Sequence, residues 1–351
     1  MRFKFRRFLQ LFLFSTLLIT VNSCTFTNIE VWLFQDFARY YTGRPINSYN
    51  PKFPPSEGVN AEGKYAIHQI NYGENNSPYY PNSYMDIFYS TENPADASDK
   101  STIIFIHGGC FWWGDTTTGN PIDHSNFYNY IMALTDAGFN VVMIDYALSP
   151  QYLFPTPIIQ VNQAMDFLLT EDQDGHTTAE KYNLNMESVI LGGNSAGAVI
   201  CSQYVASITN SKYRNSLNLK EGKFSTENLK AVILDDGFWD WNNMNSAVKV
   251  VVGNYMNKTL YLGSKTVYKY DVTNHLTENY PPTVMSVSTF TYDGKRLNSK
   301  LKSLGVETLC IKPNEDRDAN EPHCYMIKKI GKDKEVKKEF DSMIAFLKEQ
   351  L

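Results

Sequence analysis

Short apolar runs alternate with longer amphipathic segments along most of the chain. Residues 101–106 and 140–145 are continuous apolar runs, typical of strands that are buried on both faces. Residues 64–68 and 84–89 alternate apolar with polar positions, as antiparallel edge strands do. Further strands are predicted at 188–191, 229–234, 283–287 and 306–311, and helices at 29–41, 161–169, 196–208, 297–304 and 334–351. This alternation predicts an α/β fold, with a mostly parallel central sheet and helices on both faces.

The N-terminal segment has the pattern of an export signal. Four basic residues lie within positions 1–7, and positions 8–21 are nearly all apolar. This apolar run is shorter than the roughly 20 residues that a spanning helix needs. Asn22-Ser23-Cys24 resembles a lipoprotein cleavage box, in which Cys24 would be lipidated. Export is therefore expected, and plain cleavage, lipidation at Cys24 with membrane attachment, and an uncleaved anchor stay open.

The domain organisation predicted from these patterns has three parts. Residues 1–24 form the signal, 25–60 an N-terminal helix and a proline-rich linker, and 61–351 one catalytic domain. Residues 210–228 are polar and are expected to be a surface loop. Residues 238–280 are rich in Trp and Tyr, and could form either a small cap or an ordinary helical connection.

The amino-acid composition excludes some classes of binding partner. Hydrophobic residues make up 43% of the 351-residue chain, enough for a substantial core, and the net charge is −5. The acidic balance argues against nucleic acid as the main partner. The five cysteines form no CxxC pair and no metal-ligand spacing, so neither a metal nor a cofactor is expected. Cys201 should be a core thiol, whereas Cys110 and Cys324 are either cleft-lining thiols or partners of each other.

A pentapeptide from Gly193 to Gly197 predicts the nucleophile. It reads G-N-S-A-G, follows the strand at 188–191 and opens the helix at 196–208, as a nucleophile elbow requires. The sharp turn holds the serine backbone in a strained conformation, so that its neighbours must be small. Ser195 is therefore the predicted nucleophile.

A second glycine-rich turn follows the strand at 101–106. His107-Gly108-Gly109-Cys110 lies where backbone amides could face a tetrahedral oxyanion. The amides of Gly108, Gly109 and Ala196 are the expected donors. His107 is expected to anchor this loop rather than to act as a base.

Together these motifs resemble the hormone-sensitive-lipase-like esterases of the α/β-hydrolase superfamily, from about residue 60 to the end of the chain. The family's HGGG loop is similar to residues 107–110, its D-Y-R-L-A-P segment to 145–150, and its G-D-S-A-G elbow to 193–197. Its F-P-x-P, P-P-T and H-G-F motifs are similar to residues 154–157, 281–283 and 323–325. The resemblance implies the α/β-hydrolase fold and hydrolysis of small carboxylic esters without a cofactor.

The chain departs from the family pattern at four positions. Cys110 replaces the third loop glycine, Asn194 the elbow Asp, Ala147 the Arg of D-Y-R-L, and Cys324 the Gly after the catalytic His. These changes affect the lining and rigidity of the site more than its chemistry.

The general base follows from the expected chain order of serine, acid and histidine. His323 is the single histidine after the last predicted strand. It is expected to take the Ser195 proton and later to protonate the leaving alkoxide.

The acid is less clearly marked. Asp293 is the one carboxylate on the loop after the strand at 283–287, and it is the predicted acid. Asp235 and Asp236, after the preceding strand, are the alternatives, since a neighbouring strand end could also reach the imidazole. The other role open to Asp293 is that of N-cap for the helix at 297–304.

Three functions are consistent with these residues. The first is an exported carboxylesterase with an apolar pocket near residues 111–113. The second is a scaffold that has lost activity and keeps a binding role, and the third is amide or peptide hydrolysis.

Overall fold

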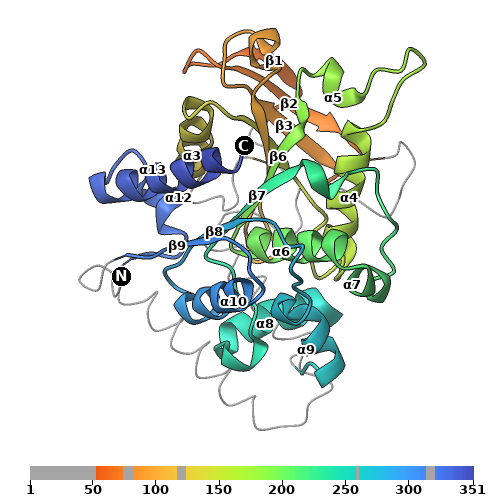
Figure 1. Ribbon diagram of the computed structural model, residues 1–351, viewed down its shortest axis with the longest axis vertical. Coiled ribbons are helices and arrows are strands. Elements are labelled where there is room, and N and C mark those ends of the chain that lie inside the picture. Colours follow the sequence, from red (N-terminus) through yellow and green to blue (C-terminus); the bar gives the residue numbers. More distant parts are fainter. Residues whose placement is uncertain (1–52, 74–81, 117–123, 258–260, 314–320) are drawn as a thin grey trace, which may run out of the picture.

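The structure is a computed structural model, and it describes residues 53–73, 82–116, 124–257, 261–313 and 321–351. The predicted export signal and the helix at 29–41 lie outside these residues. The described residues form a nine-stranded sheet in the order β1-β2-β3-β5-β4-β6-β7-β8-β9 (Figure 1). The antiparallel strands are β1 (Ser56–Val59), β2 (Tyr65–Asn71) and β3 (Tyr84–Phe88). The parallel strands are β4 (Ser101–Ile106), β5 (Asn140–Ile144), β6 (Asn185–Asn194), β7 (Leu229–Asp235), β8 (Thr283–Ser286) and β9 (Thr308–Ile311).

Helices cover both faces of the sheet. One core cluster includes side chains of α4 (Thr156–Leu168), α6 (Ala196–Thr209) and α10 (Thr291–Ser303). The cluster on the other face includes α3 (His124–Asp136), α12 (Tyr325–Lys329) and α13 (Lys334–Glu349). The predicted α/β-hydrolase fold, with a mostly parallel sheet between two helical layers, is therefore confirmed.

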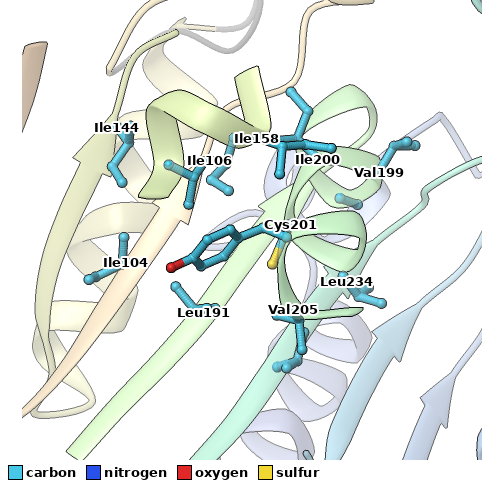
Figure 2. Close-up of a cluster of buried hydrophobic side chains, with 14 of the residues drawn as sticks. Ile104, Ile106, Ile144, Ile158, Leu191, Val199, Ile200, Cys201, Val205 and Leu234 are labelled. Carbon is cyan, nitrogen blue, oxygen red and sulfur yellow. The ribbon is translucent and has the colours of Figure 1, made fainter. Parts of the chain in front are cut away.

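Helix α6 lies at the centre of the larger cluster because its sequence is almost entirely apolar or small. From Ala196 to Ser207 every residue of this helix is buried. Figure 2 shows Cys201 and Val205 of α6 packed near Leu234 of β7 and Leu191 of β6. Cys201 is a fully buried free thiol, as the sequence predicted.

Several elements differ from the sequence-based expectation. The proline-rich segment expected to be a linker contains β1, which pairs with β2. Helix α3 was not predicted, although Phe127, Tyr130, Ile131 and Leu134 have the spacing of one helical face and are buried. The expected surface loop at 210–228 contains two short helices, α7 (Ser211–Ser216) and η2 (Thr226–Asn228).

The connection between β7 and β8 is helical. It contains η3 (Trp241–Asn243), α8 (Ser246–Asn257), α9 (Ser264–Tyr270) and η4 (Val272–Asn274). Figure 1 shows α8 and α9 gathered beside α10 at one end of the molecule. The remaining short elements are η1 (Pro94–Ala97) and α5 (Thr178–Lys181).

Candidate active site

Ser195 occupies a strained bend between β6 and α6. Its φ of 54° and ψ of −120° lie where L-residues are rarely found. A Cβ on Gly193 would lie 2.3 Å from the Gly197 carbonyl oxygen, and one on Gly197 would lie 2.0 Å from the Ile106 carbonyl oxygen. Glycine at these two positions therefore lets the chain turn tightly enough to present the Ser195 hydroxyl beyond the end of the strand.

The bend is also tied to the neighbouring strand. The Ser195 amide donates a 2.7 Å hydrogen bond to the Asp235 carbonyl, which continues the β6–β7 ladder by one residue. The position of the serine backbone is thus fixed by the sheet as well as by α6.

His323 lies between Ser195 and a carboxylate. Its Nε2 is 2.8 Å from Ser195 Oγ, and its Nδ1 is 2.7 Å from Asp236 Oδ2. Ser195 and His323, both predicted from the sequence, are therefore brought together. These distances allow the imidazole to accept the serine proton at Nε2 while Nδ1–H donates to the carboxylate.

Asp236 accepts a dense set of hydrogen bonds. Besides His323, its donors are the Ser288 hydroxyl and the backbone amides of Ser288, Thr289, Phe290 and Cys324. Burial by itself would raise the pKa of Asp236, but the hydrogen bond and charge of His323, the Ser288 hydroxyl and the Phe290 amide hold that pKa below its usual value. The carboxylate therefore stays ionised and keeps the ring in one orientation.

Asp293 is not the partner of His323, so the predicted acid is corrected to one of its alternatives, Asp236. Asp293 Oδ1 instead accepts hydrogen bonds from the amides of Trp239 and Asp240, at 2.6 and 2.7 Å. It lies in the first turn of α10, which places it against the loop after β7 rather than against the imidazole. Its contacts indicate that it fixes this loop.

Asp235, the other alternative, makes no hydrogen bond to the imidazole within the described residues. Its carboxylate contacts the Ser286 hydroxyl, and the side chain is buried. Burial, reinforced by the negative charge of Asp236, raises the pKa of Asp235 to about 7. The pKa values of the two adjacent carboxylates are thus shifted in opposite directions, because Asp236 accepts more hydrogen bonds than Asp235 and one of them comes from the imidazole.

The expected oxyanion hole needs one correction. The Gly108 amide donates a 2.9 Å hydrogen bond to Asn194 Oδ1, so it is not available to a substrate oxygen. The amides of Gly109 and Ala196 engage no acceptor among the described residues, and they remain the candidate donors. Gly109 has a φ of 100°, which suits glycine and turns this part of the loop.

His107 anchors the glycine-rich loop, as the sequence predicted. Its Nδ1 lies 2.7 Å from the Gly108 carbonyl oxygen, its Nε2 lies 3.0 Å from Asp145 Oδ1, and its ring stacks on Tyr146. Complete burial lowers the pKa of His107 to about 4. A neutral ring without access to solvent supports the loop rather than transferring protons at the site.

Cys324 lies directly beside the His323 imidazole. Its Sγ is 3.6 Å from His323 Nε2 and 3.8 Å from Asn194 Nδ2. Its backbone is left-handed, with a φ of 54°, and leads the chain into α12. Cys110 and Cys324 are both free thiols, so the alternative in which they pair is not adopted.

Contacts between aromatic rings join the helical segment between β7 and β8 to the site. Phe111 stacks on Tyr255 of α8 with ring centroids 3.8 Å apart, and Phe238 contacts both Phe111 and Phe290. The Phe290 ring in turn lies edge-on to His323 at 5.3 Å. The connection therefore packs against the glycine-rich loop and flanks the imidazole.

The fold and this arrangement of residues are those of an α/β hydrolase. Residues 85–289 match the family model described as BD-FAE, which is more than half of the chain. The chain belongs to this family. The predicted membership of the esterase branch of the superfamily is confirmed by this match together with the relatives below.

Among curated proteins, the chain is similar to an acetyl esterase of Salmonella paratyphi B. The two are 26% identical over 165 residues, which is 44% of this chain and 46% of the relative. The chain thus spans about half the length of this relative.

Among solved structures, the chain is similar to esterase B from Lactobacillus rhamnosis, with a TM-score of 0.65 and 16% identity over 92% of this chain and 94% of that one. It is also similar to a truncated carbohydrate esterase from gut microbiota, with a TM-score of 0.61 and 17% identity over 84% and 99% of the two chains. At these identities the likeness shows the fold.

The described residues include no helix that is both long and apolar enough to cross a bilayer.

Proposed function

We propose that this chain is a serine hydrolase that cleaves small carboxylic esters through an acyl-enzyme on Ser195. The observation that carries the proposal is the hydrogen-bonded series Ser195 Oγ, His323 Nε2, His323 Nδ1 and Asp236 Oδ2, with distances of 2.8 and 2.7 Å. The acetyl esterase among the relatives favours a short acyl group.

Acylation follows from this geometry. Ser195 Oγ attacks the ester carbonyl carbon while His323 Nε2 removes the hydroxyl proton. The carbonyl oxygen becomes an oxyanion and accepts hydrogen bonds from the amides of Gly109 and Ala196. The imidazolium then gives its proton to the leaving alkoxide, and the acyl group remains on Ser195.

Deacylation uses the same groups on water. His323 Nε2 takes a proton from the attacking water, a second tetrahedral oxyanion forms, and its collapse returns the proton to Ser195 Oγ. Asp236 keeps its negative charge throughout and stabilises the transient imidazolium. Neither step requires a cofactor.

The alternative function, an inactive scaffold with a binding role, was based on the absence of a clear catalytic acid. Asp236 provides a carboxylate in hydrogen-bond contact with the imidazole, so this argument for inactivity no longer applies. Amide hydrolysis would use the same groups, and no described feature favours it over ester hydrolysis.

The test is hydrolysis of p-nitrophenyl acetate together with labelling by a fluorophosphonate probe. The full chain should turn over the ester and should be labelled once, at Ser195. The Ser195→Ala variant should lose both properties, with kcat lowered on the order of 10⁵-fold or more. Turnover of amino-acid p-nitroanilides at the rate of the ester would replace the esterase proposal with amide hydrolysis.

We also propose that the protein is exported, on the strength of the basic and apolar pattern in residues 1–21. Cell fractionation and mass spectrometry of the mature N-terminus test whether the protein is exported. An N-terminal diacylglyceryl group on Cys24 would establish membrane attachment, and its absence from a Cys24→Ala variant is the control. An intact Met1 on a protein found only inside the cell would contradict export.

A further inference from the structure

The thiol of Cys324 and the catalytic imidazole present two metal-binding atoms to the same space. Cys324 Sγ lies 3.6 Å from His323 Nε2, the nitrogen that also faces Ser195 Oγ. Asp236, His323 and Cys324 each offer one ligand atom, and these atoms lie within 4.8 Å of one another. No local sequence pattern indicates such a cluster, since His323 is 87 positions away from Asp236.

The distance between the sulfur and the nitrogen matches the requirements of zinc. Tetrahedral Zn²⁺ binds cysteine sulfur at about 2.3 Å and histidine nitrogen at about 2.0–2.1 Å, which sets the two ligand atoms about 3.5 Å apart. The observed 3.6 Å therefore matches the separation of two ligands on one ion, and Ser195 Oγ, 2.8 Å from the same nitrogen, would have to turn aside to admit it.

The imidazole is also oriented as a metal ligand is. A ligating histidine usually donates its other ring N–H to a carboxylate, which fixes the tautomer and raises the basicity of the coordinating nitrogen. His323 Nδ1 contacts Asp236 Oδ2 at 2.7 Å, and this leaves the Nε2 lone pair directed away from the carboxylate. The hydrogen bond that prepares Nε2 as a base also prepares it as a ligand.

We propose that Cys324 Sγ and His323 Nε2 form an inhibitory site for a thiophilic divalent cation, with Zn²⁺ as the representative ion. Ser195 Oγ or water would complete the coordination. Binding converts the Cys324 thiol to a thiolate and releases one proton to solvent, and no electron is transferred. An ion on Nε2 occupies the lone pair that must receive the Ser195 proton, so ester hydrolysis stops.

The exposure of the two ligand residues determines how a cation could reach the Cys324 sulfur. The His323 side chain is 33% exposed and Cys324 is 4% exposed, so an ion would reach the sulfur from the side of the imidazole. A bound cation would stabilise the Cys324 thiolate directly.

The binding test uses Co²⁺ and Zn²⁺ on the purified full chain. Co²⁺ should produce thiolate-to-cobalt charge-transfer absorption, and Zn²⁺ should abolish it by displacement. The Cys324→Gly variant removes the sulfur at a left-handed position that glycine tolerates, and Cys324→Ser replaces sulfur with a harder oxygen. Both variants should lose the absorption, whereas Cys310→Ser, which removes another free and partly exposed thiol, should retain it.

The inhibition test rests on the proposed esterase function. Each variant is compared with its own metal-free rate in p-nitrophenyl acetate hydrolysis, and a chelator should restore the wild-type rate. Removal of the sulfur should weaken Zn²⁺ inhibition by more than about 10-fold, since losing even an outer-shell partner typically costs that factor.

The two readouts separate the two proposals. A Cys324-dependent cobalt spectrum without ester turnover would support the metal site and contradict the esterase function. Ester turnover with no cobalt spectrum, or with equal Zn²⁺ inhibition of the wild type and Cys324→Gly, would overturn the metal site and leave the esterase function intact.

Discussion

Asp236 Oδ2 lies 2.7 Å from Nδ1 of His323 and also accepts a 3.0 Å hydrogen bond from the amide of Cys324, the next residue along the chain. One carboxylate oxygen therefore fixes both the ring and the backbone that carries it. Because of this double contact, a small chemical change at Asp236 should have a large effect on proton transfer.

The first prediction compares Asp236→Asn with Asp293→Asn. An amide at position 236 removes the negative charge and favours the wrong imidazole tautomer, so kcat should fall on the order of 10⁴-fold. An amide at position 293 keeps an oxygen for the amides of Trp239 and Asp240, so kcat should change by less than about 10-fold. Steady-state hydrolysis of p-nitrophenyl acetate measures both, and equal losses would show that the acid has been misassigned.

The second prediction concerns the tight turn around Ser195. In Gly197→Ala, the added Cβ would meet the Ile106 carbonyl oxygen at 2.0 Å, so that backbone must move. The free energy of unfolding should fall by about 1–3 kcal/mol or more, the range expected of overpacking. Urea unfolding followed by tryptophan fluorescence measures the change.

Gly263→Ala is the matched control for that measurement. A Cβ at Gly263 would meet no heavy atom within 4 Å, and the residue has no left-handed backbone. Because Gly263 is the N-cap of α9, where Gly is preferred to Ala, its unfolding free energy should fall by no more than about 1 kcal/mol. A similar loss in both variants would mean that close packing at the bend is not the cause.

The third prediction is a pH dependence of stability that arises from Asp235. Its pKa in the folded chain is raised from 3.8 to about 7, so between these values the folded state holds a proton that the unfolded state has released. This contribution to stability is fully present below about pH 4 and is lost as the pH rises through about 7. Asp235→Asn keeps an oxygen for the Ser286 hydroxyl and removes the titration.

Urea unfolding at pH 5 and pH 8 checks this effect. The wild type should lose stability between pH 5 and pH 8, and Asp235→Asn should not lose this contribution. The unfolding free energy of the variant minus that of the wild type should therefore be higher at pH 8 than at pH 5. A difference between the two proteins that is identical at both pH values would contradict the raised pKa.

The fourth prediction separates the ring of Tyr255 from its hydroxyl. The ring stacks on Phe111 at 3.8 Å, while the buried hydroxyl has no hydrogen-bond partner within the described part of the chain. Tyr255→Ala should lower the unfolding free energy by about 3–5 kcal/mol and should also lower kcat, because Phe111 belongs to the glycine-rich loop. Tyr255→Phe should be neutral or stabilising, since it removes only the unpaired hydroxyl. Thermal unfolding ranks the variants, and a Phe variant as unstable as the Ala variant would refute the stacking argument.

Much of the fold could be predicted because its signals are local. The strand at 101–106 has the same bounds in the structure, and the parallel order follows from repeated strand and helix segments. The positions of Ser195 and His323 could be predicted because each follows a recognisable strand, and the order of the motifs fixes which edge they share.

The acid and one amide donor could not be predicted, because both depend on contacts between distant segments. β7 and β8 are adjacent and end at the same edge, so carboxylates after either strand are equally plausible from the sequence. Only the three-dimensional arrangement shows that Asp293 turns toward residues 239–240. Likewise, nothing near Gly108 in the sequence indicates that its amide is taken by Asn194, 86 residues away.

The pairing of β6 with β7 has a consequence for how activity would be lost on heating. The serine backbone and the residue preceding Asp236 are joined by a hydrogen bond of the central sheet, so the nucleophile and the acid can separate only if that sheet opens. His323 instead lies in the described residues 321–324, outside the strands of that sheet, and is held to the acid by side-chain and amide hydrogen bonds. Moderate heating should therefore lower activity before the sheet unfolds, and cooling should restore turnover without global refolding.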